Sequence, residues 1–261
     1  MVGDGVVFVA WKDPEHRAIH PVARLLERPA SPYFEFTYLA GVRAAERAGF
    51  SPFLAFPDEN AAYRSDDLFP LFQNRVMVER RPDYAEYLSR LGLSNGVTPV
   101  TLLLRSGGHR VTDRVQMFGR PFVDPLKNVL IYDFFIRGAR HVVGAEERIR
   151  ALSPGDPLSC MDDPHNTKHR HAIALRTEPG SVLGCMPEYI AEDLAQFAAE
   201  KATFDVRVTQ VNPEHAPAQH RLLCRLEVPR PHGFEPYSSE RFRPLANDAS
   251  PLPPLASMSI A

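Results

Sequence analysis

The side chains with the clearest chemical potential lie in a polar run that ends at His171. Asp163-Pro164-His165-Asn166 contains turn-forming residues, and Lys168-His169-Arg170-His171 follows after one threonine. Lysine and arginine carry positive charge and donate hydrogen bonds, so this basic loop suits contacts to the phosphates of a nucleic acid. A solvated loop without a ligand has the same composition, and the sequence leaves that alternative open.

The histidines of this run raise a second alternative, a metal site. His165, His169 and His171 lie close in sequence, and Asp162 or Asp163 could add a carboxylate to neutral imidazole, which is a good zinc ligand. The spacing matches no established zinc or nuclease motif, however. No Ser-His-Asp arrangement or paired-carboxylate motif follows from the spacing either. We therefore predict no metal, no cofactor and no catalytic residue.

A glycine pair is a further candidate anion site. In Arg105-Ser106-Gly107-Gly108-His109-Arg110, glycines at positive φ could align backbone N-H groups on a phosphate. A Gly-Gly between two apolar runs more often forms a hairpin turn. The runs Val100 to Leu104 and Val115 to Phe118 flank it, so we predict a hairpin here.

The composition indicates two small domains without a membrane span. A chain of 261 residues, 44% of them hydrophobic, can form two modest cores. The 30 basic and 32 acidic residues give a net charge of -2, so any nucleic-acid surface must be local. The three cysteines form no CxxC pair, which favours a reducing cytoplasm. No apolar run is long enough to cross a membrane, and no secretory signal is recognisable at the N-terminus.

The basic loop must be held by the elements on either side of it. Residues 158 to 195 have the pattern of a strand, the polar loop, a second strand at Ala172 to Leu175, a turn, a third strand and a helix. Glu178-Pro179-Gly180-Ser181 suits the turn, and Pro187 suits the first turn of the helix.

This order of elements resembles the HIRAN domain, a small barrel found fused to fork-remodelling helicases and free-standing in bacteria. The family typically has acidic-Pro-x-Asn, an Ala-Ile/Val pair, then Gly-x-x-x-Gly-x-x-Pro and a helix. The matching segments here are Asp163-Pro164-His165-Asn166 with Ala172-Ile173, and Val182-Leu183-Gly184-Cys185-Met186-Pro187. The resemblance spans residues 128 to 231 and implies an OB-like, DNA-binding barrel.

The resemblance also implies a groove that receives a single-stranded DNA end. In the best understood members, an aromatic pair near the first strand holds the terminal nucleotides. Phe134, Phe135 and Arg137 occupy that place here. A flat ring stacks on a base of any kind for about 1 to 3 kcal/mol. Since neighbouring strand side chains point to opposite faces, one phenylalanine should belong to the core, while the other is either the stacking ring or core as well.

The second place in the groove departs from the family pattern. Lys168 and His169 stand where those members have Tyr and Asp in the polar loop. Lysine accepts no hydrogen bond, and neutral histidine offers one acceptor. We therefore expect Asn166, Lys168, His169 and Arg170 to contact DNA with little preference for a free 3' hydroxyl.

The N-terminal part resembles the N-terminal subdomain of HipA-type toxin kinases. That subdomain has a strand meander, a Phe-x-Tyr strand, an apolar strand ending in Pro, a Pro-Phe/Leu-Phe-x-Asn turn and a helix. Phe36-Thr37-Tyr38, Phe53-Leu54-Ala55-Phe56-Pro57 and Phe69-Pro70-Leu71-Phe72-Gln73-Asn74 stand in that order here, and Asp83 to Leu91 suits the helix. No phosphate loop or kinase signature follows. The resemblance implies a docking module without phosphoryl transfer.

Together these features predict a mostly β protein with short helices (α+β) and two small modules. We expect a HipA-like module at 1-97, a hairpin linker at 98-127, a HIRAN-like barrel at 128-244 and an extended tail at 245-261. The predicted function is non-catalytic binding of single-stranded, terminal or damaged DNA within a bacterial or phage defence or repair system. The first module would dock a protein partner or form a homodimer. Alternatives are a protein-binding regulator or antitoxin-like subunit, and a nuclease with an unrecognised metal site.

Overall fold

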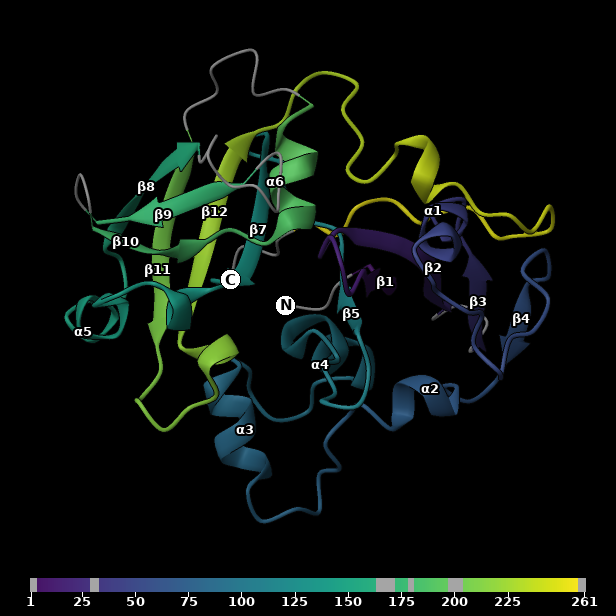
Figure 1. The fold of residues 1–261 in the computed structure, drawn as a ribbon, viewed down its shortest axis with the longest axis horizontal. Helices are drawn as coiled ribbons and strands as arrows, with labels where there is room; N and C mark the ends of the chain where they lie inside the picture. Colours follow the sequence, from purple (N-terminus) through teal and green to yellow (C-terminus); the bar gives the residue numbers. More distant parts are fainter. Residues whose placement is uncertain (1–3, 29–32, 163–171, 178–180, 197–203, 258–261) are drawn as a thin grey trace. The chain divides into compact units, whose positions relative to one another are not determined.

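The computed structural model describes residues 4-28, 33-162, 172-177, 181-196 and 204-257 (Figure 1). The chain divides into two compact units. Unit 1 comprises Met1–Tyr84, Gly96–Arg120 and Glu235–Ala256, and unit 2 comprises Ala85–Asn95, Pro121–Phe234 and Ser257–Ala261. Over these described residues, each unit contains one antiparallel sheet, and no strand is shared between the two sheets. The prediction of a mostly β fold with short helices is confirmed.

Unit 1 is built on a five-stranded sheet in the order β4-β3-β2-β1-β5. The strands are β1 (Val6–Lys12), β2 (Ile19–Arg28), β3 (Tyr33–Tyr38), β4 (Tyr63–Ser65) and β5 (Val115–Phe118). Strands β1 and β2 pair antiparallel, with Val6 opposite Leu26. Both faces of β1 are covered, because Val6 to Ala10 are all fully buried. A strand buried on both faces explains its continuous run of apolar residues.

The segment Phe53 to Phe56, expected as a strand, is an irregular loop. Backbone groups of this loop form hydrogen bonds with the side chain of Tyr38, where a strand would bond a neighbouring strand. Its hydroxyl donates to the Phe56 carbonyl at 3.0 Å and accepts from the Phe53 N-H at 2.8 Å. The ring of Phe56 stacks on Phe36 with centroids 3.8 Å apart. The apolar pattern thus identified core residues correctly, but a side chain satisfies the backbone.

Three helices accompany this sheet: α1 (Val42–Arg47), α2 (Pro70–Gln73) and α4 (Pro99–Ser106). Helix α4 corrects the predicted hairpin, since its residues were expected to form a strand. The Thr98 side chain accepts a hydrogen bond from the Thr101 N-H at 3.2 Å, and Pro99 occupies the first helical position. These are start signals of a helix. Gly107 ends it at φ 76°, so the glycine pair is a helix terminus.

The last part of unit 1 returns to its sheet after a short 3-10 helix, η4 (Glu240–Phe242). Tyr237 and Phe242 pack against Phe8 and Phe118, with ring centroids 5.0 to 5.5 Å apart for three of these contacts. Pro244 forms a β-bridge with Leu39, and residues 245-256 contain no helix or strand. The part of the predicted tail that the structure describes within unit 1 is therefore irregular in backbone and held by specific contacts.

Unit 2 is built on a seven-stranded sheet in the order β10-β9-β8-β11-β12-β7-β6. The strands are β6 (Phe122–Asp124), β7 (Val129–Phe135), β8 (Pro157–Asp162), β9 (Ile173–Arg176), β10 (Val182–Cys185), β11 (Asp205–Val211) and β12 (Leu222–Pro229). Strands β9 and β10 cross the direction of β11 and β12, so the sheet curls over on itself (Figure 1). The three strands and the helix predicted over residues 158 to 195 are confirmed, while the predicted loop and turn at 163-171 and 178-180 lie outside the described residues.

The helical elements of unit 2 are α3 (Tyr84–Arg90), α5 (Ala145–Arg150), α6 (Glu188–Leu194) and the 3-10 turns η1 (Ala139–His141) and η3 (Ala218–His220). Helix α3, which the sequence placed in the first module, is tied to β11. Gln210 donates to the Ser89 carbonyl at 2.8 Å, and Asn212 donates to the Arg90 carbonyl at 2.7 Å. Helix carbonyls near a C-terminus need such donors. The predicted modules 1-97 and 128-244 remain a prediction about independent folding.

In the described ranges, no helix is long and apolar enough to cross a membrane.

Candidate functional site

The edge strand β10 of the curled sheet in unit 2 meets the chain just after β7. Arg137 and Cys185 form an isolated antiparallel bridge, in which each backbone N-H donates to the other's carbonyl at 2.8 Å. At the next residue of the chain, the Met186 N-H donates to the Ile173 carbonyl at 2.9 Å. The bridge joins the residues just after β7, the strand next to the edge strand β6, to β10 at the opposite edge of the sheet. It therefore closes the curled sheet into a barrel at this corner.

Gly184 makes this close approach possible. A Cβ atom at position 184 would lie 2.6 Å from the Arg137 carbonyl oxygen and 3.3 Å from the Ala139 nitrogen. Such distances are too short for any side chain, so the second glycine of the sequence motif has a steric role. Pro187 follows and caps helix α6, as predicted from its position.

The bridge continues as a row of paired residues across the neighbouring strands. Cys185 lies opposite Ala174, and Ala174 lies opposite Met161. Residues directly opposite one another in antiparallel strands present side chains to the same face. Arg137 therefore lies in one row with Cys185 and Met161, of which Met161 is 36% exposed.

The basic loop leaves and rejoins the sheet at this same end. Asp162, the last residue of β8, pairs with Ile173, the first residue of β9. The loop residues Asn166, Lys168, His169 and Arg170, and with them His165 and His171, lie outside the described residues. The register of the two strands thus brings the ends of this loop beside the barrel corner.

Arg137 is half-buried and is hydrogen-bonded to Tyr189 in the first turn of α6. Burial raises the pKa of the Tyr189 phenol, although the Arg137 guanidinium acts in the opposite direction. The phenol therefore stays neutral near pH 7, and its oxygen accepts from the guanidinium. Sequence reasoning did not single out Tyr189. The available signal was Pro187, because a helix starting there places its first turn beside the bridge.

Both predicted aromatic residues are core residues. Phe134 is 3% exposed and Phe135 is 6% exposed. Phe134 shares a strand face with Tyr132, which is bonded to α6, while Phe135 packs on His220 of η3 with ring centroids 5.0 Å apart. Each face of β7 is thus covered by its own helix, so strand alternation exposes neither ring. The open alternative for the outer phenylalanine is resolved in favour of the core.

Helix α6 is fixed to the barrel by a buried polar pair. The Tyr132 hydroxyl donates to Asp193 Oδ2 at 2.8 Å, and the Gln196 amide donates to Asp193 Oδ1 at 3.2 Å. Asp193 is only 2% exposed. Burial and the adjacent carboxyl group raise the pKa of Tyr132 well above its ordinary value, so its proton stays available as a donor. The pair fixes the position of the helix that carries Tyr189.

The thiol of Cys160, near this corner, is not activated. Cys160 and Cys185 lie on the strands either side of β9, and all three cysteines are free thiols. Burial raises the pKa of Cys160 to about 11 and that of Cys224 further still. A neutral thiol is a poor nucleophile and a poor metal ligand. Within the described ranges, no group of three or more His, Cys, Asp or Glu side chains could hold a metal ion.

Comparison with known proteins assigns a family to this barrel. Residues 130–229 match the family model of the HIRAN domain. The matched segment begins in β7 and ends at the last residue of β12, so it contains the closing bridge, the basic loop and α6. None of the curated proteins compared with the chain matches it.

Two crystal structures are similar over 38% of this chain, each at 17% sequence identity. One is a structural-genomics protein from Lactobacillus plantarum, of which 94% is covered, with a TM-score of 0.33. The other is the HIRAN domain of human HLTF, of which 74% is covered, with a TM-score of 0.30. The family-model match over the closed barrel carries the conclusion that residues 130–229 of this chain are a HIRAN domain.

Proposed function

We propose that this protein binds DNA through its HIRAN domain and does no chemistry on it. The observation that carries the proposal is the family match over residues 130–229. The net charge of -2 means that binding must come from a local basic surface. The corner formed by Arg137 and the ends of the basic loop is the place in unit 2 where such a surface would form.

Arg137 is the described residue best suited to a phosphate contact. Its backbone is fixed by two hydrogen bonds to Cys185, and among the described residues its guanidinium has a partner in Tyr189. A guanidinium has five N-H donors, so it can bind a phosphate without leaving the tyrosine. We propose that Lys168 and Arg170 add phosphate contacts, with Asn166 and His169 beside them. Since Phe134 and Phe135 are buried, we propose that they pack in the core and so stabilise the end of β7 that precedes Arg137.

We further propose single-stranded, terminal or damaged DNA as the preferred form. Because Lys168 and His169 replace the Tyr-Asp pair of well understood HIRAN domains, a free 3' hydroxyl should give little advantage. A bacterial or phage defence or repair system would be the setting. The HipA-like resemblance of the N-terminal part adds the proposal that it docks a protein partner or a second copy.

Binding titrations with labelled single-stranded, duplex and tailed oligonucleotides at several salt concentrations test this proposal. Wild-type protein should bind at low salt, most tightly to the single-stranded or tailed forms, and Arg137→Ala should weaken binding to all of them. Arg150→Ala is the matched control, since that exposed arginine of α5 pairs with Glu214. Tyr189→Phe keeps the ring and removes only the partner of Arg137.

The outcomes separate the competing functions. No measurable affinity of the wild-type protein at low salt would refute DNA binding and favour a protein-binding regulator. Cleavage of the oligonucleotides in the presence of Mn²⁺ or Zn²⁺ would instead favour a nuclease. A loss equal for Arg137→Ala and Arg150→Ala would show non-specific attraction in place of a site.

A further inference from the structure

The segment Ser250-Pro251-Leu252-Pro253-Pro254 has an unusual backbone chemistry. Three of its five residues are prolines, which have no N-H group and so cannot pair as an ordinary strand. Such segments favour an extended conformation whose carbonyls point outward, and it costs little further entropy to hold them. A surface that binds this segment must therefore provide mainly hydrogen-bond donors.

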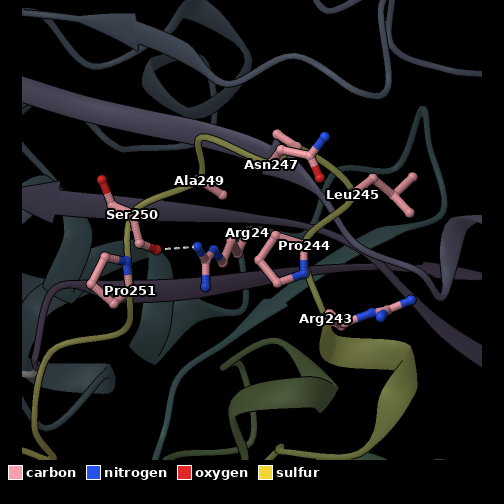
Figure 2. A pocket seen from close by; sticks show the side chains of 9 residues that line it. Arg24, Arg243, Pro244, Leu245, Asn247, Ala249, Ser250 and Pro251 are labelled. Atoms are coloured by element: carbon pink, nitrogen blue, oxygen red, sulfur yellow. Dashed lines mark hydrogen bonds between the residues drawn. The ribbon is translucent and has the colours of Figure 1, made fainter.

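Unit 1 provides these donors as a row of arginines. Arg24 donates to the Ser250 carbonyl (Figure 2). Arg28 donates to the Pro251 carbonyl at 3.1 Å. Arg120 donates to the Pro253 carbonyl and, at 3.4 Å, to the Pro254 carbonyl. Four carbonyls of the proline-rich segment, all but that of Leu252, are thus bound by arginines from β2 and from the residues that follow β5.

One acidic side chain, that of Glu35, binds both hydrogen-bond donors of Ser250. Glu35 of β3 is fully buried, and it accepts from both the Ser250 N-H and the Ser250 hydroxyl at 2.8 Å. The residue before the first proline therefore needs an N-H and a hydroxyl together. A hydrogen bond to a buried charged acceptor is among the stronger polar contacts in proteins. The groove thus distinguishes Ser-Pro from other X-Pro pairs.

Arg24, Arg120 and Glu35 also have hydrogen-bond partners outside the segment that they bind. Arg24 Nε donates to the Thr37 hydroxyl at 3.2 Å, Arg120 Nε donates to Asp4 at 2.7 Å, and Arg64 Nε donates to Glu35 at 3.0 Å. Burial lowers the pKa of Arg24 to about 10, which still leaves it charged near pH 7. Removing the proline-rich segment would leave the buried donors ready for the same chemistry from another chain.

The segment itself contributes little apolar burial. Every residue from Ser250 to Ala256 is half-buried or exposed. Beside it lies an open pocket of about 500 Å³, lined by Arg24 and by residues 243 to 247 and 249 to 251 (Figure 2). The attachment is therefore mainly polar, and polar contacts to a surface exchange readily with an equivalent ligand because solvent replaces them during release.

We propose that Arg24, Arg28, Arg120 and Glu35 form a receptor groove for an extended Ser-Pro-x-Pro-Pro segment of a partner protein, and that the chain's own residues 250 to 254 occupy it as an internal competitor. The partner is recognised by a serine hydroxyl and by consecutive proline carbonyls. Leu252 makes none of these contacts, so the middle position is unrestricted.

The test uses the full-length chain and a fluorescent peptide with the sequence of residues 247 to 256. Ser250→Ala removes one bond to Glu35 from the internal segment and weakens its competition. The peptide should bind this variant about tenfold more tightly than it binds the wild-type chain, since a hydrogen bond to a charged group is worth about a factor of ten or more. Pro251→Gly should also strengthen peptide binding, because glycine gives the released internal segment more conformational entropy and so weakens its binding to the groove.

Matched changes in the peptide and in the protein complete the design. Replacing the serine of the peptide by alanine should weaken its binding about tenfold, while replacing the leucine should leave it nearly unchanged. In the Ser250→Ala chain, Arg28→Ala should weaken binding, whereas Arg243→Ala should not, because Arg243 lines the pocket but pairs with Glu240. A peptide-sensitive dimer of the wild-type chain would identify a second copy as the partner. No peptide binding to either loosened variant, or equal binding of the serine and alanine peptides, overturns the proposal.

Discussion

Arg137 and Cys185 exchange both of their backbone hydrogen bonds at 2.8 Å, and this bridge joins the residues after β7 to the edge strand β10 of the curled sheet in unit 2. The first residue precedes the basic loop in sequence and the second follows it. The bridge therefore fixes the position of an arginine side chain beside the strands that carry the loop. At this corner, the absence of a Cβ atom at Gly184 permits the close approach of the two backbones, and helix α6 begins after Pro187.

Substitution of Gly184 should open the barrel. Gly184→Ala places a Cβ atom 2.6 Å from the Arg137 carbonyl, so the bridge must separate or shift. We expect a loss of about 1 to 3 kcal/mol in the free energy of unfolding, as for other overpacked sites. Denaturant unfolding measures it. Gly138→Ala is the control, because it has φ +75° but open space around the added Cβ, and should cost about 1 kcal/mol from backbone strain alone. A Gly184→Ala cost no larger than the control would contradict the steric role.

The hydroxyl of Tyr38 should stabilise unit 1 through the loop that it holds. Tyr38→Phe keeps the ring stacked in the core but leaves the Phe56 carbonyl and the Phe53 N-H without their partner. Losing such buried bonds costs about 1 to 3 kcal/mol. Thermal or denaturant unfolding of the variant should show this loss. Tyr33→Phe, at the other end of β3 and half-buried, is the matched control, and an equal effect of both changes would refute the role of the hydroxyl.

The same tyrosine predicts a stability loss at alkaline pH. Burial raises the pKa of Tyr38 to about 12, whereas the unfolded chain has about 10. The folded state holds this proton more tightly, so the contribution is complete below about pH 10 and disappears as pH rises from about 10 to about 12. Two pKa units correspond to roughly 3 kcal/mol. Unfolding at about pH 8 and about pH 11.5 should therefore show a smaller pH-dependent loss for Tyr38→Phe than for the wild type. If the free energies of unfolding of the wild type and of Tyr38→Phe change in parallel with pH, the alkaline stability loss does not come from Tyr38.

Removal of a phosphate contact should change the salt dependence of DNA binding in a defined way. For Arg137→Ala or Lys168→Ala, the slope of log K against log salt concentration should flatten by about 0.7 on single-stranded DNA, because one fewer counterion is released. Titrations at several salt concentrations give the slope directly. Arg150→Ala should leave it unchanged. Weaker binding with an unaltered slope would mean that Arg137 acts on the barrel and makes no phosphate contact.

The sequence by itself determined the order of elements around the basic loop. Turn formers at 163 to 166, the apolar run from Ala172 and the glycine and proline of Val182 to Pro187 are local signals, and each acts through the backbone of the residues that carry it. The strands and the helix therefore appear where these signals predict them. The start of α4 was also encoded locally, by Thr98 and Pro99, although the apolar run that follows suggested a strand.

Only the tertiary structure decided which of these residues meet. The burial of both Phe134 and Phe135 depends on α6 and η3, which cover opposite faces of β7 from distant parts of the chain. The hydrogen bond between Arg137 and Tyr189 requires the barrel to close. The hydrogen bond from the Ser250 N-H to Glu35 requires the C-terminal segment to return to β3. Local periodicity contains no information about such pairs, because the free energy that selects them comes from packing between segments far apart in sequence.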